Sequence, residues 1–355
     1  MKKISLVILF SILSAALGFS KAAPTMLNVL DFGADKSGAK DSTEAISKAI
    51  AAAVDGGTVF LPAGRYRISE TLVIKKSGLT LLGDGRANLQ RNTGGTLLLL
   101  DSKTTNMAIH VLAVSYSGVK NMGVARPDKA PIARGAKHEA LIKLERSYHC
   151  FLQEILLTNP VNGLDIMNGI SPLVEDLDIK NPRGDFGIWI HGSGRDGDSY
   201  RKMDATLLFR CAGSSTAANT EVNWLVIGPN VDGAKIEDGR FVGGGRALVL
   251  LKGNPEKGDV RPKYVYADRF GCDHVNYEGV VVEAGNDLFM TNTWIGQNKK
   301  GTGFVIGPDF TGPALITNIR IRGSGGHGMH IQRTAYRTGS EGTFVGARPY
   351  ARWGI

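Results

Sequence analysis

Five side chains with acid–base or ring-binding chemistry recur at equivalent places in three short, similar segments of this 355-residue chain. The segments read Leu-Ile-Lys143-Leu-Glu145, Gly-Leu-Asp165-Ile-Met and Gly-Ile-Trp189-Ile-His191. In each segment polar and apolar residues alternate, which is the period of a half-buried β-strand with its polar side chains on one face. The spacing therefore predicts that the five side chains project from one surface.

Two kinds of catalysis fit these residue types. Asp165 and Glu145 could act as the acid and base of glycoside hydrolysis, which needs two carboxyl groups about 5–5.5 Å apart for retention or about 6.5–9.5 Å for inversion. Lys143 or His191 could instead remove the acidic C5 proton of a uronate, while a neighbouring cation stabilises the developing negative charge, as in β-elimination. Trp189 offers a flat apolar surface for a sugar ring. The structural alternative is a surface salt bridge between Lys143 and Glu145, with Trp189 and His191 packed against their neighbours.

The three segments belong to a longer repeat of short strands. A small residue followed by an apolar–any–apolar pattern begins at positions 108, 141, 163, 187, 223, 247, 279, 303 and 328, so five of the eight intervals are 22 to 25 residues. Helical periodicity is nearly absent after Ala53. A period in the twenties predicts a β-solenoid, in which equivalent positions stack about 4.8 Å apart. A β-sandwich is the alternative, but it does not explain the repeated interval.

Alignment of the nine segments predicts two outward columns of side chains. The first column reads His110, Lys143, Asp165, Trp189, Leu225, Val249, Val281, Val305 and His330. The second column reads Leu112, Glu145, Met167, His191, Ile227, Leu251, Glu283, Gly307 and Gln332. Ionisable residues gather in the second to fourth coils, and later coils are largely apolar. We expect a loop, the C-terminal tail at 334–355 or a second chain of a homo-oligomer to cover the apolar part.

The longest insertion follows His191 directly and is expected to overhang the ionisable cluster. Its polar side chains include Arg195, Asp196, Asp198, Tyr200, Arg201 and Lys202. We interpret the basic and aromatic members, together with Trp189, as substrate-binding residues. Asp196 and Asp198 are a weak candidate for Ca²⁺, because an EF-hand site needs more oxygen ligands at set positions. No other cofactor is indicated, and a solvated loop with paired charges is the alternative.

The N-terminal residues predict export. Lys2 and Lys3 precede an apolar run at 4–19, and small residues follow it. This is the pattern of a bacterial secretory signal peptide at 1–23, too short for a membrane span. We therefore expect residues 24–355 to form a single secreted or periplasmic domain with no transmembrane segment.

Net charge and cysteine content limit the classes of binding partner and of cysteine site that the chain can have. Loss of three lysines with the signal peptide lowers the net charge from +9 to +6, because 42 basic residues become 39 against 33 acidic ones. Outside the cytoplasm, a modest positive charge favours an anionic polysaccharide over nucleic acid. The three cysteines, Cys150, Cys211 and Cys272, are too few and too dispersed for a disulfide framework or a zinc site.

The segment NVLDFGADKSGAKDSTEAISKAIAAA, residues 28–53, predicts a strand, a turn and the one clear helix of the mature chain. Asp41 is expected to cap this helix, with Glu44 at the third helical position. Its apolar stripe, which includes Ile46 and Ile50, suits a lid over the open end of a solenoid. Together with GGTVFLPAGRYRI and LTLLGDG, this start, residues 28–86, resembles the pectate-lyase-like superfamily. The resemblance implies an all-β, right-handed parallel β-helix of about nine to eleven coils, an N-terminal capping α-helix and sugar-polymer substrates.

The resemblance does not fix the reaction, because the fold hosts lyases, hydrolases, epimerases and non-enzymatic binders. Polygalacturonase motifs fail here: Asn292-Thr293-Trp294 has Trp in place of the catalytic Asp, and the chain has no Asp-Asp pair. The Asp-Pro-His-Asp signature of alginate epimerases is also absent. We therefore expect a polysaccharide lyase that cleaves an acidic, uronate-containing polymer by β-elimination. A glycoside hydrolase and a non-catalytic glycan-binding or assembly protein are the alternatives.

Overall fold

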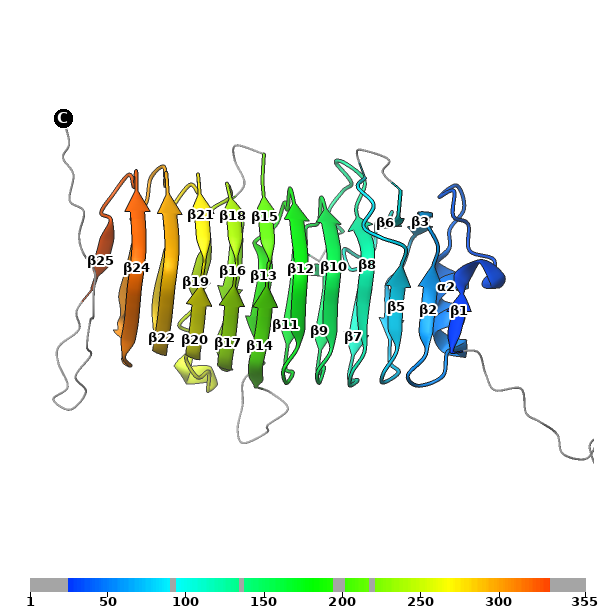
Figure 1. Ribbon diagram of the computed structural model, residues 1–355, viewed down its shortest axis with the longest axis horizontal. Coiled ribbons are helices and arrows are strands. Elements are labelled where there is room, and N and C mark those ends of the chain that lie inside the picture. Colours follow the sequence, from blue (N-terminus) through cyan, green and yellow to red (C-terminus); the bar gives the residue numbers. More distant parts are fainter. Residues whose placement is uncertain (1–24, 90–93, 134–136, 194–201, 217–220, 333–355) are drawn as a thin grey trace, which may run out of the picture.

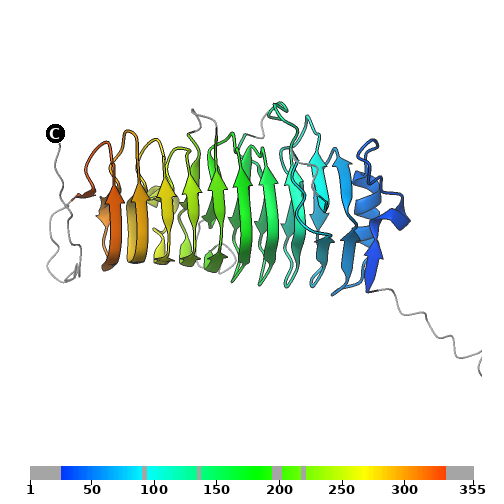
Figure 2. The same cartoon turned by 45° about the horizontal axis from the view of Figure 1, so that its top comes forward.

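The computed structural model describes residues 25–89, 94–133, 137–193, 202–216 and 221–332. Within these ranges the strands are stacked as coils along one long axis, with one short α-helix at the N-terminal end (Figures 1 and 2). The strand pairings between successive coils are parallel. The chain therefore forms the right-handed parallel β-helix that the repeat and the N-terminal resemblance predict.

One face of each coil is formed by sheet B, which carries the segment containing Lys143. Sheet B contains β4 (Leu72–Ile74), β7 (Ile109–Leu112), β9 (Ala140–Glu145), β11 (Asn162–Met167), β13 (Phe186–His191), β16 (Asn223–Ile227), β19 (Leu248–Leu250), the first part of β22 (Val280–Gly296), β23 (Phe304–Phe310) and β25 (Met329–Ile331). These ten strands, one from each coil, give the stack its repeat.

Sheet A forms the rest of the coil wall as two runs of strands. The first run contains β1 (Met26–Asn28), β2 (Thr58–Leu61), β5 (Thr80–Gly83), β8 (Gly118–Ala125), β10 (Phe151–Thr158), β12 (Leu173–Lys180), β14 (Met203–Phe209), β17 (Val231–Glu237), β20 (Lys263–Asp268), the middle of β22 and β24 (Ala314–Arg322). The second run contains β3 (Gly64–Ile68), β6 (Thr96–Leu100), β15 (Ala212–Ser214), β18 (Arg240–Val242) and β21 (Gly271–Asp273). In β8, β10, β12, β22 and β24 one long strand serves both runs.

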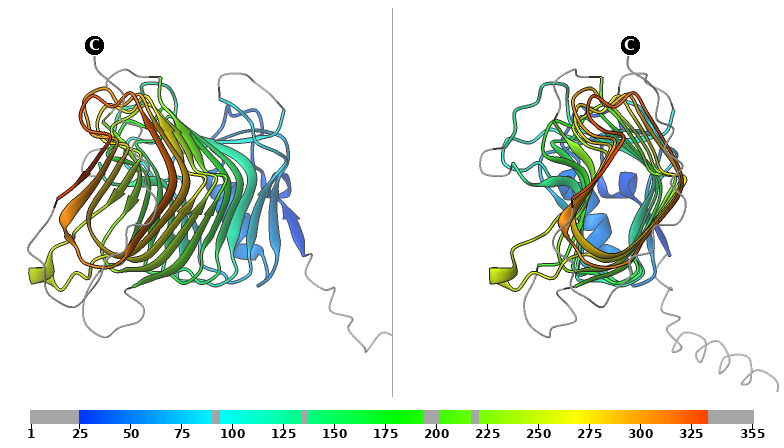
Figure 3. Two further views of the ribbon diagram at one scale, coloured as in Figure 1. Left: turned by 60° about the vertical axis from the view of Figure 1, so that its left-hand side comes forward. Right: turned by 90° about the vertical axis from the view of Figure 1, so that its left-hand side faces the viewer.

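The core fills the interior of the coil, and Figure 3 shows how the stacked strands surround this interior. Ile142, Leu164 and Ile188 occupy the same level of successive coils, and all three are fully buried. Burial of each such side chain contributes about 1.5–3 kcal/mol relative to exposure. The alternate residues of the same strands face outward, which is why a two-residue period in the sequence separates core from surface.

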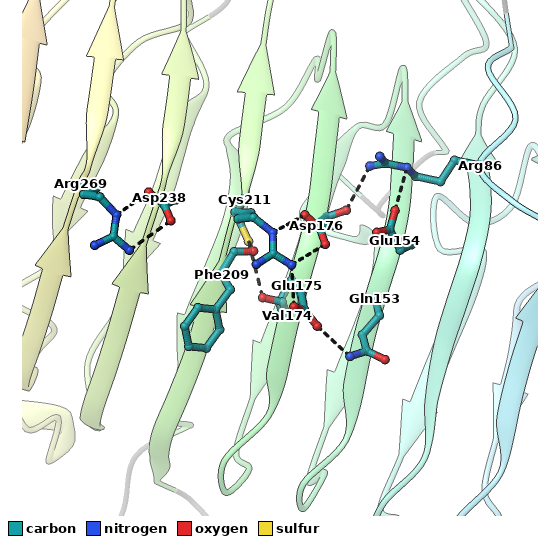
Figure 4. Close-up of polar contacts among 11 residues, drawn as sticks. Arg86, Gln153, Glu154, Val174, Glu175, Asp176, Phe209, Cys211, Asp238 and Arg269 are labelled. Carbon is teal, nitrogen blue, oxygen red and sulfur yellow. Dashed lines mark hydrogen bonds and ion pairs between the residues drawn. The ribbon is translucent and has the colours of Figure 1, made fainter.

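The two runs of sheet A meet at a bend formed by residues in the left-handed region. The bend residues have φ between 49° and 56° and are Asn121, Glu154, Asp176, Arg210, Asp238, Arg269, Asn292 and Asn318. Opposite charges alternate along part of this column. The guanidinium of Arg210 donates to both carboxylate oxygens of Asp176 (2.7 Å each), and Arg269 pairs with Asp238 (2.7 Å); Figure 4 shows Asp176 and the Arg269–Asp238 pair. These exposed contacts link side chains of successive coils along the bend.

Helix α2 (Thr43–Ala52) covers the first coil, as the sequence predicts. Ile46 and Ile50 lie on its buried side within the main core. The predicted cap is displaced by one residue: Ser42 is the N-cap by backbone geometry, and Asp41 accepts from the Thr43 N–H (2.8 Å). With Ser42 as the N-cap, Glu44 lies at the second helical position and not at the predicted third, so it does not complete a capping box. It pairs with Lys48 one turn later (2.7 Å). Two short 3₁₀ helices, η1 (Val29–Phe32) and η3 (Pro255–Lys257), lie elsewhere.

The predicted columns are wrong at the fifth coil. Trp189 pairs with Val226, not with Leu225, and Ile190 pairs with Ile227, so Leu225 and Ile227 face the core. The shift arises because the large Trp224 side chain occupies the interior beside Gly187. An added Cβ at Gly187 would lie 3.0 Å from the Trp224 ring, so glycine there leaves the indole its space.

The apolar part of the first column is covered at two of its positions. Val226 and Val249 are only 7% and 4% exposed. Val226 packs with Phe186, Trp189 and Leu251, so neighbouring side chains of the described residues contribute to its cover. The predicted tail at 334–355 lies outside the described residues.

The three cysteines are buried free thiols. Burial raises the pKa of Cys211 and Cys272 to about 12, which makes their thiolates scarce. In the part of the chain that the structure describes, no helix has the length and apolar character needed to cross a membrane.

Candidate active site

The outward side chains of β9, β11 and β13 form one ionisable cluster, as the sequence predicts. In the first column, His110 lies beside Lys143, Lys143 beside Asp165, and Asp165 beside Trp189. In the second column, Met167 separates Glu145 from His191. The strand register therefore places all four predicted catalytic side chains on three adjacent coils of sheet B.

Lys143 lies at the centre of the cluster and contacts two carboxylates. Its Nζ atom is 3.0 Å from Oε2 of Glu145 and 3.6 Å from Oδ2 of Asp165. The outer oxygen of Glu145 faces Arg146, with 3.9 Å between Nε and Oε1. Glu145 and Asp165 are thus each within reach of at least one cation.

His191 is held by a carboxylate and by an aromatic ring. Its Nε2 atom lies 2.9 Å from Oδ1 of Asp165, and these two side chains are only 12% and 10% exposed. The imidazole stacks on the Trp189 indole, with ring centroids 3.8 Å apart and planes inclined by 15°. Trp189 also packs against Phe186 at 5.3 Å. One face of the predicted sugar-binding ring is therefore in contact with His191.

Glu145 is a carboxylate that stays ionised. Burial by itself raises its pKa, but the hydrogen bond and charge of Lys143, together with His110, outweigh burial and lower it. His110 Nε2 lies 3.1 Å from Glu145 Oε2. Burial lowers the pKa of His110, and Lys143 acts in the same direction, while Glu145 opposes both. His110 is therefore predominantly neutral at neutral pH.

An open groove of about 290 Å³ lies over the cluster. It is lined by Met107, His138, Glu139, Ala140, Lys143, Asp165, Met167, Trp189 and His191. Glu139 is held in the groove wall by the Thr105 hydroxyl (3.0 Å) and the Asn106 N–H (2.8 Å). Polar groups converging on an open, partly apolar groove are the usual composition of a binding site.

The structure describes only part of the predicted substrate-binding insertion. Lys202 is exposed and immediately precedes β14. Arg195, Tyr200 and Arg201 lie outside the described residues, as do Asp196 and Asp198, the candidate Ca²⁺ ligands. Among the described residues, no three His, Cys, Asp or Glu side chains gather in a way that could hold a metal ion.

Three site residues were missed by the sequence argument. His110 occupies the coil before Lys143 in the same column, so the column itself contained the signal. Arg146 follows Glu145 directly, where strict alternation would place it inward; its positive φ of 49° instead turns the chain at the strand end. Glu139 precedes a strand, and nothing in the repeat indicates that its carboxylate reaches the groove.

The arrangement supports proton transfer more readily than acid catalysis by a carboxylic acid. When the Nε2–H of His191 donates to Asp165, the lone pair at Nδ1 is free to accept a proton. Lys143 supplies a positive charge next to this base. A glycosidase acid, by contrast, needs a carboxyl group whose pKa is raised, and the pKa of Glu145 is lowered.

Comparison with known proteins gives concordant results for the family and the fold. The profile of the family described as rhamnogalacturonase A/epimerase, pectate lyase-like, matches residues 26–240. Mannuronan C5-epimerase AlgE1 of Azotobacter vinelandii is 47% identical over 70 residues, which are 18% of this chain and 5% of that protein. Rhamnogalacturonase A of Aspergillus niger is 24% identical over 182 residues, which are 48% of this chain and 40% of that protein. The chain thus spans less than half the length of these curated relatives.

Among solved structures, the A-module of mannuronan C-5 epimerase AlgE4 from Azotobacter vinelandii aligns with a TM-score of 0.53 at 16% identity. The alignment covers 84% of this chain and 78% of that module. At this identity the likeness concerns the fold alone.

Proposed function

Because the chain belongs to the rhamnogalacturonase A/epimerase, pectate lyase-like family, we propose that it is an exported polysaccharide-active enzyme that cleaves a uronate-containing polymer by β-elimination. The observation that carries the proposal is Asp165, which contacts both the imidazole of His191 (2.9 Å) and the ammonium of Lys143 (3.6 Å). Base, orienting carboxylate and cation are therefore adjacent in one open groove.

His191 acts as the base in this mechanism. Asp165 accepts the Nε2–H and fixes the tautomer, so that Nδ1 carries the lone pair. The Trp189 ring stacks on the imidazole and limits its rotation. Nδ1 takes the C5 proton of the uronate, and the C5–H electron pair moves toward the adjacent carboxylate as an enolate. General-base catalysis of this kind contributes typically 10²–10⁴-fold.

Lys143 stabilises the enolate and Glu145 holds Lys143 in place before substrate binds. The substrate carboxylate approaches the ammonium, whose contact with Glu145 is 3.0 Å and only partly buried. Collapse of the enolate forms the C4–C5 double bond and breaks the bond from C4 to the glycosidic oxygen. The departing oxygen receives the proton that His191 has acquired, so the step is balanced without another reactant.

A glycoside hydrolase is the second candidate, and the match to rhamnogalacturonase A over 48% of this chain favours it. In that case Asp165 and Glu145 would have to serve as acid and base. Both carboxylates contact Lys143, and the lowered pKa of Glu145 keeps that carboxylate ionised at neutral pH, which makes Glu145 a poor general acid.

The test is digestion of a panel of uronate polymers by the purified protein, followed by ultraviolet absorbance and by assay of reducing ends. Growth of the absorbance band of an unsaturated uronate supports the proposal. New reducing ends without that band would identify a hydrolase. Deuterium incorporation at C5 in heavy water without cleavage would identify an epimerase, and no change across the panel would indicate a binding protein.

A further inference from the structure

A second outward surface, on sheet A, carries aromatic side chains in register. Along β17, β20 and β22 the outward column reads Lys235, Tyr266 and Phe289. The adjacent column begins with Phe209 on β14 and continues with Glu237 and Asp268. We use the term aromatic platform for Phe209, Tyr266 and Phe289; Figure 4 shows Phe209 on the same face as the Arg269–Asp238 pair.

Two rings of the platform are stacked face to face, and the platform is partly open to solvent. The Tyr266 and Phe289 rings are stacked with centroids 4.7 Å apart and planes inclined by only 5°. Tyr266 is 43% exposed, so its ring is accessible from solvent. The Lys235 ammonium lies 5.7 Å from the centroid of Phe209, which places a cation over the end of the platform.

Beside the rings lies a wall of polar groups held in fixed positions. Glu237 pairs with Lys235 (2.6 Å), and Asp268 accepts from the Thr291 hydroxyl (2.7 Å) and the Asn292 amide (2.8 Å). Tyr266, Phe289 and the wall border a shallow, open hollow of about 180 Å³, and Phe209 lies outside its lining. The hollow is lined by Lys235, Ile236, Glu237, Tyr266, Ala267, Asp268, Phe289 and Thr291.

We propose that this hollow is a second carbohydrate-binding site, which takes a neutral, hydroxyl-bearing sugar unit. The C–H face of a pyranose can pack on the ring face of the Tyr266–Phe289 pair that the partner ring leaves uncovered, and preorganised carboxylates accept hydrogen bonds from hydroxyl groups without moving. Charge complementarity favours a neutral sugar over a uronate: Glu237 is matched by Lys235, Asp268 by Arg269, and no unpaired cation of the hollow is left for a ligand carboxylate.

A second copy of the chain is a poorer occupant. A stable protein interface buries about 1,200–2,000 Å² in total. Three partly covered aromatic side chains, each of about 150–250 Å² when fully buried, supply only a fraction of that area. The hollow instead has the dimensions of a single-ring subsite. It lies on a different sheet from the groove, so the inference stands whether or not the groove is a lyase site.

The inference is tested by calorimetric titration with neutral oligosaccharides, using galactan, arabinan, xylan, glucan and mannan fragments. Tyr266→Ala should weaken binding at least about tenfold, and Tyr266→Phe, which keeps the stacked ring, should stay within about threefold of the wild type. Tyr264→Ala is the matched control, because Tyr264 is 46% exposed on the same strand but is absent from the hollow's lining. It should bind as the wild type does.

Three results would overturn the inference: no binding of any fragment by the wild-type protein, equal losses in the Tyr266 and Tyr264 variants, or tighter binding of uronate than of neutral fragments. Sedimentation equilibrium tests the other possible occupant, a second copy of the chain. A dimer in the wild type that is lost in Tyr266→Ala would show that the platform is an interface between copies. Thermal unfolding of each variant verifies that it is folded.

Discussion

The groove on sheet B and the aromatic platform on sheet A are both formed by outward side chains of successive coils, but their chemistry differs. In both, parallel register brings one side chain from each coil into a column. The groove column carries ionisable groups with side chains as little as 10–12% exposed, where water screens charge weakly. The charged groups beside the platform are more open to solvent, with Lys235 half exposed, and their charges are largely screened. Burial thus separates a surface suited to proton transfer from one suited to binding.

The largest expected effect is that of His191→Asn, which removes the base but retains a polar side chain against Trp189. We expect kcat to fall by about 10²–10⁴-fold, since no other described side chain contacts Asp165 as a base. His274→Asn is the matched control, because His274 also contacts an aspartate, Asp273, at 3.2 Å but is 51% exposed on another coil. The measurement is the initial rate of double-bond formation. Equal rates in both variants would remove His191 from the mechanism.

Lys143→Met should have the next largest effect on kcat, about 10²–10³-fold, because it removes the positive charge at the site of enolate formation. Its control is Lys180→Met, which breaks a similar contact with Asp178 at 2.9 Å in sheet A. A loss that appears only in KM would show that Lys143 binds the substrate equally in the ground state and the transition state.

Tyr266→Ala should affect the aromatic platform and leave the groove unchanged. We expect its kcat on short uronate substrates to equal that of the wild type, while affinity for neutral fragments falls at least about tenfold. His191→Asn should show the reverse pattern. Enzyme kinetics and calorimetry are measured on the Tyr266→Ala and His191→Asn variants. A reduced kcat of the Tyr266 variant on short substrates would mean that the two surfaces are not independent.

Most of the fold and the centre of the groove could be predicted from the sequence. Two-residue alternation and a period in the twenties are direct consequences of pleating and stacking, so Lys143, Asp165 and His191 could be aligned without coordinates. The alignment was wrong at Trp224, where an inward indole replaces the small residue that marks the other coils. A marker based on residue size cannot detect that neighbouring glycines provide the space.

The platform could not be found in the same way, because only one strand type of each coil was aligned. Tyr266 and Phe289 belong to the other strand type, and they are 23 residues apart, within the repeat interval. The contact of Arg146 with Glu145 depends on a backbone turn at the end of a strand. A left-handed φ at Arg146 redirects its side chain, and an arginine in the sequence does not indicate this conformation.

The smallest expected effect concerns stability and pH. Contacts with Lys143 and His110 lower the pKa of Glu145 despite its burial, so its carboxylate stabilises the fold above its unfolded pKa of about 4.3. This contribution is lost as the pH falls through the lower folded pKa. Glu145→Gln should therefore be less stable than the wild type at pH 7, and the difference should shrink toward pH 3. Thermal unfolding at both values measures it, and a constant difference would contradict the assignment.

The central claim is that the His191–Asp165–Lys143 cluster removes a proton from a uronate. The most direct test is ultraviolet absorbance during digestion of uronate polymers by the wild type, His191→Asn and His274→Asn. We expect the band of the unsaturated product to grow at equal rates with the wild type and His274→Asn and to be nearly absent with His191→Asn. Growth of the band at the wild-type rate with His191→Asn, or cleavage by the wild type without any band, would contradict the account.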